Sequence, residues 1–174
     1  KADREYVRKA LARGASRAKG GAGKQPGEAG HAARLANGSA DWPQFRGPGG
    51  LGISAEKRLP VTWSDQENVV WKTELHGPGS SSPIVLGDRV FVTCYSGYGV
   101  PAQPGGSMDR LKRHVLCLNP GDGKIIWRKD VEPALPEQAT VRDHGYASST
   151  PAADAERLYV FFGKSGVFAF DRDG

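Results

Sequence analysis

A repeated phrase in the second half of the chain constrains the fold more than any other feature. Ser-Ser-Ser-Pro ends at Pro83 and leads into an apolar pair, a polar turn and the apolar run 89–92. Ser-Ser-Thr-Pro ends at Pro151, 68 residues later, and leads through the same succession into the run 157–160. In each copy the proline opens a strand, where its missing N–H is least costly. The chain therefore contains two copies of one β-structured unit.

Further elements follow each phrase at matching places. The runs 114–119 and 166–171 are short apolar strands that end in polar turns. Trp71 and Trp127 are expected to open strands, and each precedes one of the two prolines. Once the inserted loops are subtracted, the phrases and the tryptophans both recur about every 40 residues, the length of a four-stranded propeller blade.

The composition of the strands agrees with stacked blades. After its arginine, the run 157–162 is apolar at every position, as expected for a sheet covered on both faces. Residues 163–166 form a hairpin turn, and the Gly- and Pro-rich stretch Tyr95–Arg113 is a loop inserted into the equivalent hairpin. We predict an all-β fold, a β-propeller of four-stranded antiparallel blades of which about two are present.

The positive charge of the chain belongs to its first 40 residues. The whole chain of 174 residues has a net charge of +5, made up of +6 in residues 1–40 and −1 in residues 41–174. The first part has few large apolar side chains to offset the entropy of ordering, so we expect a disordered basic Gly/Ala-rich leader. Residues 41–174 are expected to form a partial propeller domain. Only the leader favours a nucleic-acid binder, and no nucleic acid is expected on the folded part.

Two motif matches fail on their context. The glycines of 47–52 satisfy G-x-G-x-x-G, but neither the strand nor the helix of a dinucleotide site surrounds them. His144 stands beside Asp143 and near Ser148 and Ser149, the residue types of a hydrolase triad. No nucleophile elbow is present, and the serines belong to the repeated phrase. We therefore predict no catalytic residue in either place.

The remaining histidines give no metal signal. His76, His114 and His144 have neither the paired spacing of metal ligands nor a helix to display it, so surface or loop positions are expected. No run approaches the ~18 apolar residues of a membrane-spanning helix.

The two cysteines, Cys94 and Cys117, are expected to be small apolar core residues. If strands 90–94 and 114–118 pair with Cys94 opposite His114, then Cys117 lies opposite Phe91. This register separates the two thiols by about 10 Å along the ladder, too far for a disulfide.

One stretch resembles a known repeat. Residues 117–127 read Cys-Leu-Asn-Pro-Gly-Asp-Gly-Lys-Ile-Ile-Trp, similar to the tryptophan-docking repeat A-x-D-x-x-T-G-K-x-x-W of the quinoprotein-like, or PQQ-repeat, β-propellers. The matching positions are Gly123, Lys124 and Trp127, and the departures are Cys117, Asn119 and Asp122. Residues 41–48, Asp-Trp-Pro-Gln-Phe-Arg-Gly-Pro, resemble the segment that opens exported members of this superfamily. Since closed rings take about 4–8 blades, the chain is expected to be the amino-terminal portion of such a propeller.

The resemblance implies structural roles for the marked residues. Those expected to dock one blade on the next are Trp71, Trp127, Asn119, Gly123, Lys124, Pro83 and Pro151. It also implies a non-catalytic scaffold that contacts other proteins in the periplasm or cell envelope, with no cofactor or metal in this part. The alternative is a PQQ-dependent dehydrogenase whose blades beyond this chain hold PQQ and calcium, where the family has an adjacent cysteine pair that Cys94 and Cys117 do not form.

Overall fold

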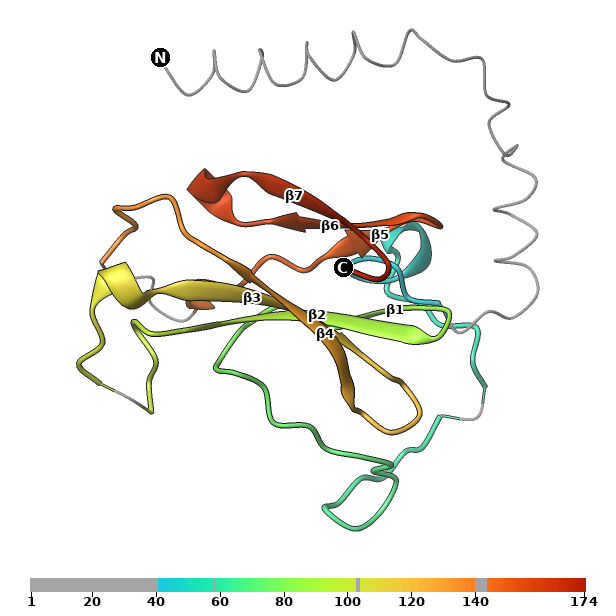
Figure 1. Ribbon diagram of the computed structural model, residues 1–174. Helices are drawn as coiled ribbons and strands as arrows, with labels where there is room; N and C mark the ends of the chain where they lie inside the picture. The colour runs from blue at the N-terminus through green and yellow to red at the C-terminus, as the bar shows by residue number, and fades with distance from the viewer. Residues whose placement is uncertain (1–40, 58, 103, 140–143) are drawn as a thin grey trace, which may run out of the picture. The chain divides into compact units, whose positions relative to one another are not determined.

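The computed structural model describes residues 41–57, 59–102, 104–139 and 144–174. Within these ranges the regular structure consists of two antiparallel sheets and short 3-10 turns, without an α-helix (Figure 1). The all-β prediction is confirmed. The leader expected over residues 1–40 lies outside the described residues. Nothing in the described ranges forms a helix with the length and apolar character needed to cross a membrane.

The first sheet is a four-stranded meander. Its strands, in chain order and each antiparallel to the next, are β1 (Ile84–Leu86), β2 (Arg89–Ser96), β3 (Lys112–Leu118) and β4 (Ile125–Val131). Gly87 joins β1 to β2 with φ +58°, a left-handed conformation that glycine adopts at low cost. Four antiparallel strands joined in sequence are the arrangement of a propeller blade.

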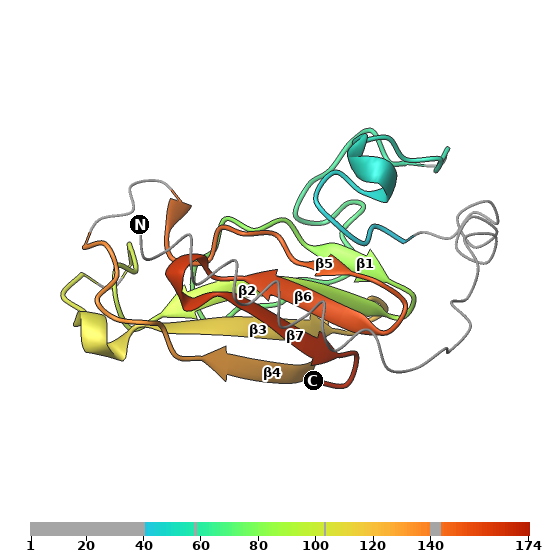
Figure 2. The same ribbon diagram turned by 90° about the horizontal axis from the view of Figure 1, so that it is seen from above.

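The second sheet repeats the first three strands of that order. It contains β5 (Ala152–Ala153), β6 (Arg157–Phe161) and β7 (Val167–Asp171), again antiparallel and in chain order. Figure 2 shows the second sheet lying over one face of the first. Two sheets stacked face to face, built from the two copies of the repeat, correspond to two partial propeller blades.

The main core lies between the two sheets. Its almost completely buried side chains include Phe91, Val115 and Cys117 of the first sheet and Leu158, Val160 and Phe162 of the second. Burial of a large apolar side chain contributes about 1.5–3 kcal/mol, so this interface dominates the packing. A smaller cluster of Cys94, Leu116 and Leu118 lies on the opposite face of the first sheet.

Two expectations about strands and loops need correction. The loop predicted to start at Tyr95 starts after Ser96 and ends before Lys112, because Tyr95 pairs with Arg113 in the ladder and both are buried. No strand forms around Trp71, and its segment has no ladder partner among the described residues. The residues around Trp71 form no regular secondary structure, and Leu75 packs against the smaller cluster of Cys94, Leu116 and Leu118.

Two further expectations, both about burial, also need correction. One face of β6 is covered, but Tyr159 and Phe161 on its other face are 37% and 52% exposed, because no further sheet packs there in the described chain. His114 is no surface or loop residue: it lies in the middle of β3 and is buried.

The predicted register of the cysteines is confirmed. Cys94 pairs with His114 and Cys117 with Phe91, and both thiols are free and buried. Removal from water disfavours the thiolate and raises the pKa of each to about 11.

These thiols should be almost inert in the folded protein. The thiolate is the reactive form, so at pH 8 we expect Ellman's reagent to react with native Cys94 and Cys117 on the order of 100-fold more slowly than with the chain in guanidinium. Absorbance at the released thionitrobenzoate band gives both rates. A fast native phase at either position would contradict their place in the core.

Candidate functional site

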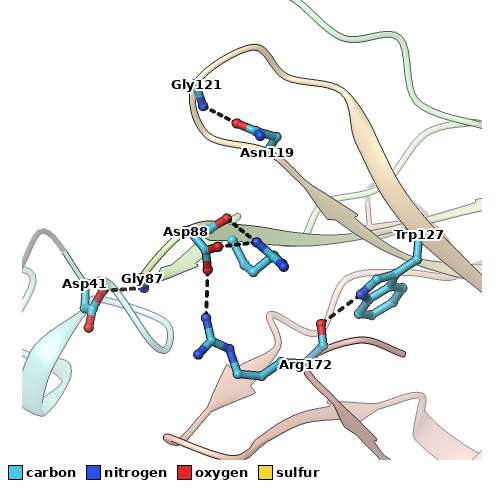
Figure 3. Close-up of polar contacts among 8 residues, drawn as sticks. Asp41, Gly87, Asp88, Asn119, Gly121, Trp127 and Arg172 are labelled. Carbon is cyan, nitrogen blue, oxygen red and sulfur yellow. Dashed lines mark hydrogen bonds and ion pairs between the residues drawn. The ribbon is translucent and has the colours of Figure 1, made fainter.

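Two tryptophans make the same contact one repeat apart. The indole Nε1–H of Trp71 donates to the carbonyl oxygen of Pro120 at 2.7 Å. The indole Nε1–H of Trp127 donates to the carbonyl oxygen of Arg172 at 2.9 Å (Figure 3). Pro120 comes two residues after Leu118, and Arg172 comes two residues after Phe170; Leu118 and Phe170 are the equivalent residues of β3 and β7 that pair with β2 and β6. Each tryptophan therefore reaches the turn that follows the third strand of a sheet.

Two residues of the turn that binds Trp71, Asn119 and Gly123, have specific structural roles. Asn119 Oδ1 accepts the N–H of Gly121 at 2.7 Å (Figure 3), and Asp171 Oδ1 accepts the N–H of Asp173 at 3.0 Å in the second sheet. Asparagine thus replaces the aspartate of the repeat without loss of the turn. Gly123 has φ +70°, and a Cβ there would lie 2.4 Å from the Trp71 ring. Only glycine fits under that ring.

Three other predicted residues differ in their surroundings. Lys124 is exposed, and its ammonium pairs with Asp122 at 2.9 Å. Pro83 is exposed, whereas Pro151 is completely buried. The two repeated phrases lie side by side, since the N–H of Ser82 donates to Thr150 Oγ1 at 3.0 Å.

The opening segment fastens the first strands of both sheets. Trp42 forms an antiparallel bridge with Val85 of β1, and the carbonyl oxygen of Pro43 accepts the N–H of Ala153 in β5 at 2.8 Å. Asp41 Oδ1 accepts the N–H of Gly87 at 2.7 Å in the β1–β2 turn (Figure 3). The opening segment therefore hydrogen-bonds to the first strand of each sheet, β1 and β5, and links the two sheets there.

A cavity of about 240 Å³ opens between the sheets at the end where the long connections leave β2 and β4. Its lining combines a charged pair, hydroxyl groups and aromatic rings from Arg113, Glu137, Ser148, Ser149, Phe161 and Phe162. The two serines of the rejected triad are thus in the cavity wall. His144 is exposed, and Asp143 lies outside the described residues.

A buried arginine organises this cavity. Arg113 is 4% exposed, and its Nη2 lies 2.6 Å from Glu137 Oε1. Its Nε–H donates to the carbonyl oxygen of Tyr146 at 2.9 Å, and Nη1 donates to Ser165 Oγ at 2.8 Å. The guanidinium also stacks over Phe162, 5.4 Å from the ring centroid. One side chain of the first sheet therefore holds both the connection after β4 and the β6–β7 turn.

Sequence reasoning missed Arg113 because the residue was placed at the end of the inserted loop. The available signal was the apolar run that follows it, since extension of that strand by two residues makes Arg113 a ladder position beside buried neighbours.

Loss of the Trp127 ring should destabilise the fold far more than loss of an exposed tryptophan. Trp127 packs against Phe91 and Phe170 and holds the Arg172 carbonyl. We expect Trp127→Ala to lower the free energy of unfolding by about 3 kcal/mol. Trp63→Ala is the matched control, because Trp63 is 64% exposed, and its effect should stay within about 0.5 kcal/mol. Urea unfolding followed by circular dichroism measures both, and equal effects would refute the docking role.

The Arg113 pair gives a second matched comparison. Arg113→Ala leaves Glu137 buried without its partner, so we expect a loss of about 3–5 kcal/mol. The adjacent Lys112 forms an exposed ion pair with Glu132, and Lys112→Ala should change stability by about 0.5 kcal/mol or less. Thermal unfolding of the two variants tests this. Equal melting temperatures for the two variants would show that the Arg113–Glu137 pair stabilises the fold no more than the exposed Lys112–Glu132 pair does.

Comparison with known proteins agrees with the repeat and its contacts. A family model described as outer membrane protein assembly factor BamB, of the PQQ-repeat type, matches residues 47–174. No curated protein and no solved structure matches the chain. The family match spans both sheets and the turns that receive the tryptophans, and it covers well over half of the sequence. The chain belongs to the BamB-like PQQ-repeat family of β-propeller proteins.

Proposed function

We propose that this chain is a PQQ-like β-propeller interaction scaffold that binds other proteins outside the cytoplasm. The observation that carries the proposal is the set of exposed apolar side chains in residues 45–70, which we call the apolar segment. Eight of them are between 40% and 90% exposed: Phe45, Leu51, Ile53, Leu59, Val61, Trp63, Val69 and Val70. A concentration of exposed apolar side chains marks an interaction surface on a folded protein.

The apolar segment is fixed at both ends. Before it, Trp42 bridges to β1. After it, the Trp71 indole binds the carbonyl of Pro120, and Thr73 Oγ1 donates to the carbonyl of Gly123 at 2.6 Å. Between these anchors the described residues contain no strand. An irregular segment held on a rigid scaffold is the usual form of a binding loop.

The chemistry of this surface favours polypeptide partners. Residues 41–174 have a net charge of −1, so a polyanion such as nucleic acid finds no basic surface there. Apolar side chains including a tryptophan are typical of the centre of protein–protein interfaces. The family description, an assembly factor for outer membrane proteins, supports partners that are proteins and a location in the cell envelope.

In this proposal the seven marked residues keep the scaffold rigid. Trp71 and Trp127 dock on the turns, Asn119, Gly123 and Lys124 shape one such turn, and Pro83 and Pro151 open the first strands. The contacts of both indoles and the steric demand at Gly123 support these roles. Binding through the apolar segment involves neither a catalytic residue nor a cofactor.

Photo-cross-linking tests the proposal. We expect benzoylphenylalanine at Trp63 or Val70 to cross-link the full chain to a small set of envelope proteins. The same probe at Glu156, which is exposed on the β5–β6 turn, should give only background. With the probe at Val70, the double variant Val61→Asp/Trp63→Asp should abolish cross-linking without a change in melting temperature. Equal cross-linking from position 156 would show that the apolar segment is not the binding surface.

A further inference from the structure

Three polar side chains form a line across one face of the first sheet. Ser96 ends β2, His114 lies in β3 and Asp130 lies in β4. Asp130 is directly opposite His114 in the ladder. Ser96 stands two residues beyond Cys94, the other partner of His114, and therefore shares its face. This set is distinct from the serines near His144.

The hydrogen bonds of His114 define the direction of proton transfer. Its Nδ1 lies 2.9 Å from Asp130 Oδ1, and its Nε2 lies 2.8 Å from Ser96 Oγ. An ionised carboxylate only accepts hydrogen bonds, so the proton of the neutral ring is on Nδ1. Nε2 then presents its lone pair to the Ser96 hydroxyl. Serine, histidine and carboxylate in this order form the relay that activates a serine nucleophile.

The surroundings hold the relay in place. His114 is 3% exposed, and the ring of His76 lies 5.8 Å from its ring. Asp130 Oδ1 also binds Arg128 Nε at 2.9 Å. Burial opposes ionisation of Asp130, but the hydrogen bond from His114 and the charges of Arg128 and Lys112 outweigh it and lower the pKa of the carboxyl. The base is therefore oriented before any substrate arrives.

Ser96 itself can be reached from solvent. It is half-buried and is the last residue of β2, where the connection 97–111 begins. Lys112 is directly opposite Ser96 in the ladder, and its exposed ammonium is paired with Glu132 at 3.1 Å. A partly exposed serine hydrogen-bonded to a buried histidine keeps the hydroxyl proton within reach of a general base.

We propose that Ser96 is the nucleophile of an esterase site that hydrolyses small activated carboxylic esters. Ser96 Oγ attacks the ester carbonyl while His114 Nε2 takes the hydroxyl proton. The alkoxide leaves with that proton as the alcohol, and the acyl group stays on Ser96. Water, deprotonated by His114, then attacks the acyl group, and the carboxylic acid and the free serine are released. The site is separate from the apolar segment and adds an activity to the scaffold.

A fluorophosphonate probe tests the nucleophile directly, because it forms a stable bond to an activated serine with loss of fluoride. We expect the full chain to be labelled on the peptide that contains Ser96, as read by mass spectrometry, and to hydrolyse p-nitrophenyl acetate. Ser96→Ala should abolish both signals. Ser107→Ala is the control, since Ser107 is exposed and outside the relay, and it should leave both signals unchanged.

Asp130→Asn separates a proton relay from a structural network. It keeps the size of the side chain but no longer fixes the proton on Nδ1, so labelling should slow on the order of 100-fold or more. Circular dichroism checks that each variant is folded.

Several outcomes would overturn the proposal. Absence of label on Ser96 in the folded wild-type chain is sufficient alone, even if the Asp130 variant does not fold. Labelling of Ser96 at the same rate in wild type and folded Asp130→Asn would show that the serine is merely accessible. Ester hydrolysis that survives Ser96→Ala would place the activity elsewhere.

Discussion

The indole of Trp127 joins the two sheets at the point where the second sheet turns after β7. Its ring packs against Phe91 and Phe170, and its N–H satisfies the carbonyl of Arg172. A large aromatic ring with one polar atom can bury its surface only if that atom finds an acceptor. The turn supplies this acceptor at a fixed distance from the third strand, so the same contact is possible wherever the repeat recurs. Trp71 makes it one unit earlier.

The sequence predicted the features that depend on local pattern. The repeated Ser-Pro and Thr-Pro phrases located β1 and β5, and the spacing of apolar runs located the other strands. The register of Cys94 and Cys117 followed from simple counting along a hairpin. Features that depend on which elements pack on a strand could not be predicted from the local sequence pattern. Trp71 has a strand-like sequence but no ladder partner among the described residues, and Tyr159 lies on a face of β6 where no other described sheet packs.

The candidate sites bring together residues from different strands, and the order of residues along the sequence does not show which of them become neighbours. Arg113 was assigned to a loop, although its three hydrogen-bonded partners lie 24 to 52 residues away. Ser96 and Asp130 flank His114 at separations of 18 and 16 residues, and only the ladder places all three on one face. A serine before a glycine-rich loop gives no signal of this kind by itself.

The relay on the first sheet is difficult to explain by stability alone. It shares its face with Cys94, Leu116 and Leu118, where apolar side chains already pack. Because buried polar groups must regain the hydrogen bonds they lose to water, such a network contributes little more than an apolar replacement. What it does provide is a fixed tautomer of His114 and a defined proton acceptor beside an accessible hydroxyl. The physical value of the arrangement therefore lies in proton transfer to and from Ser96.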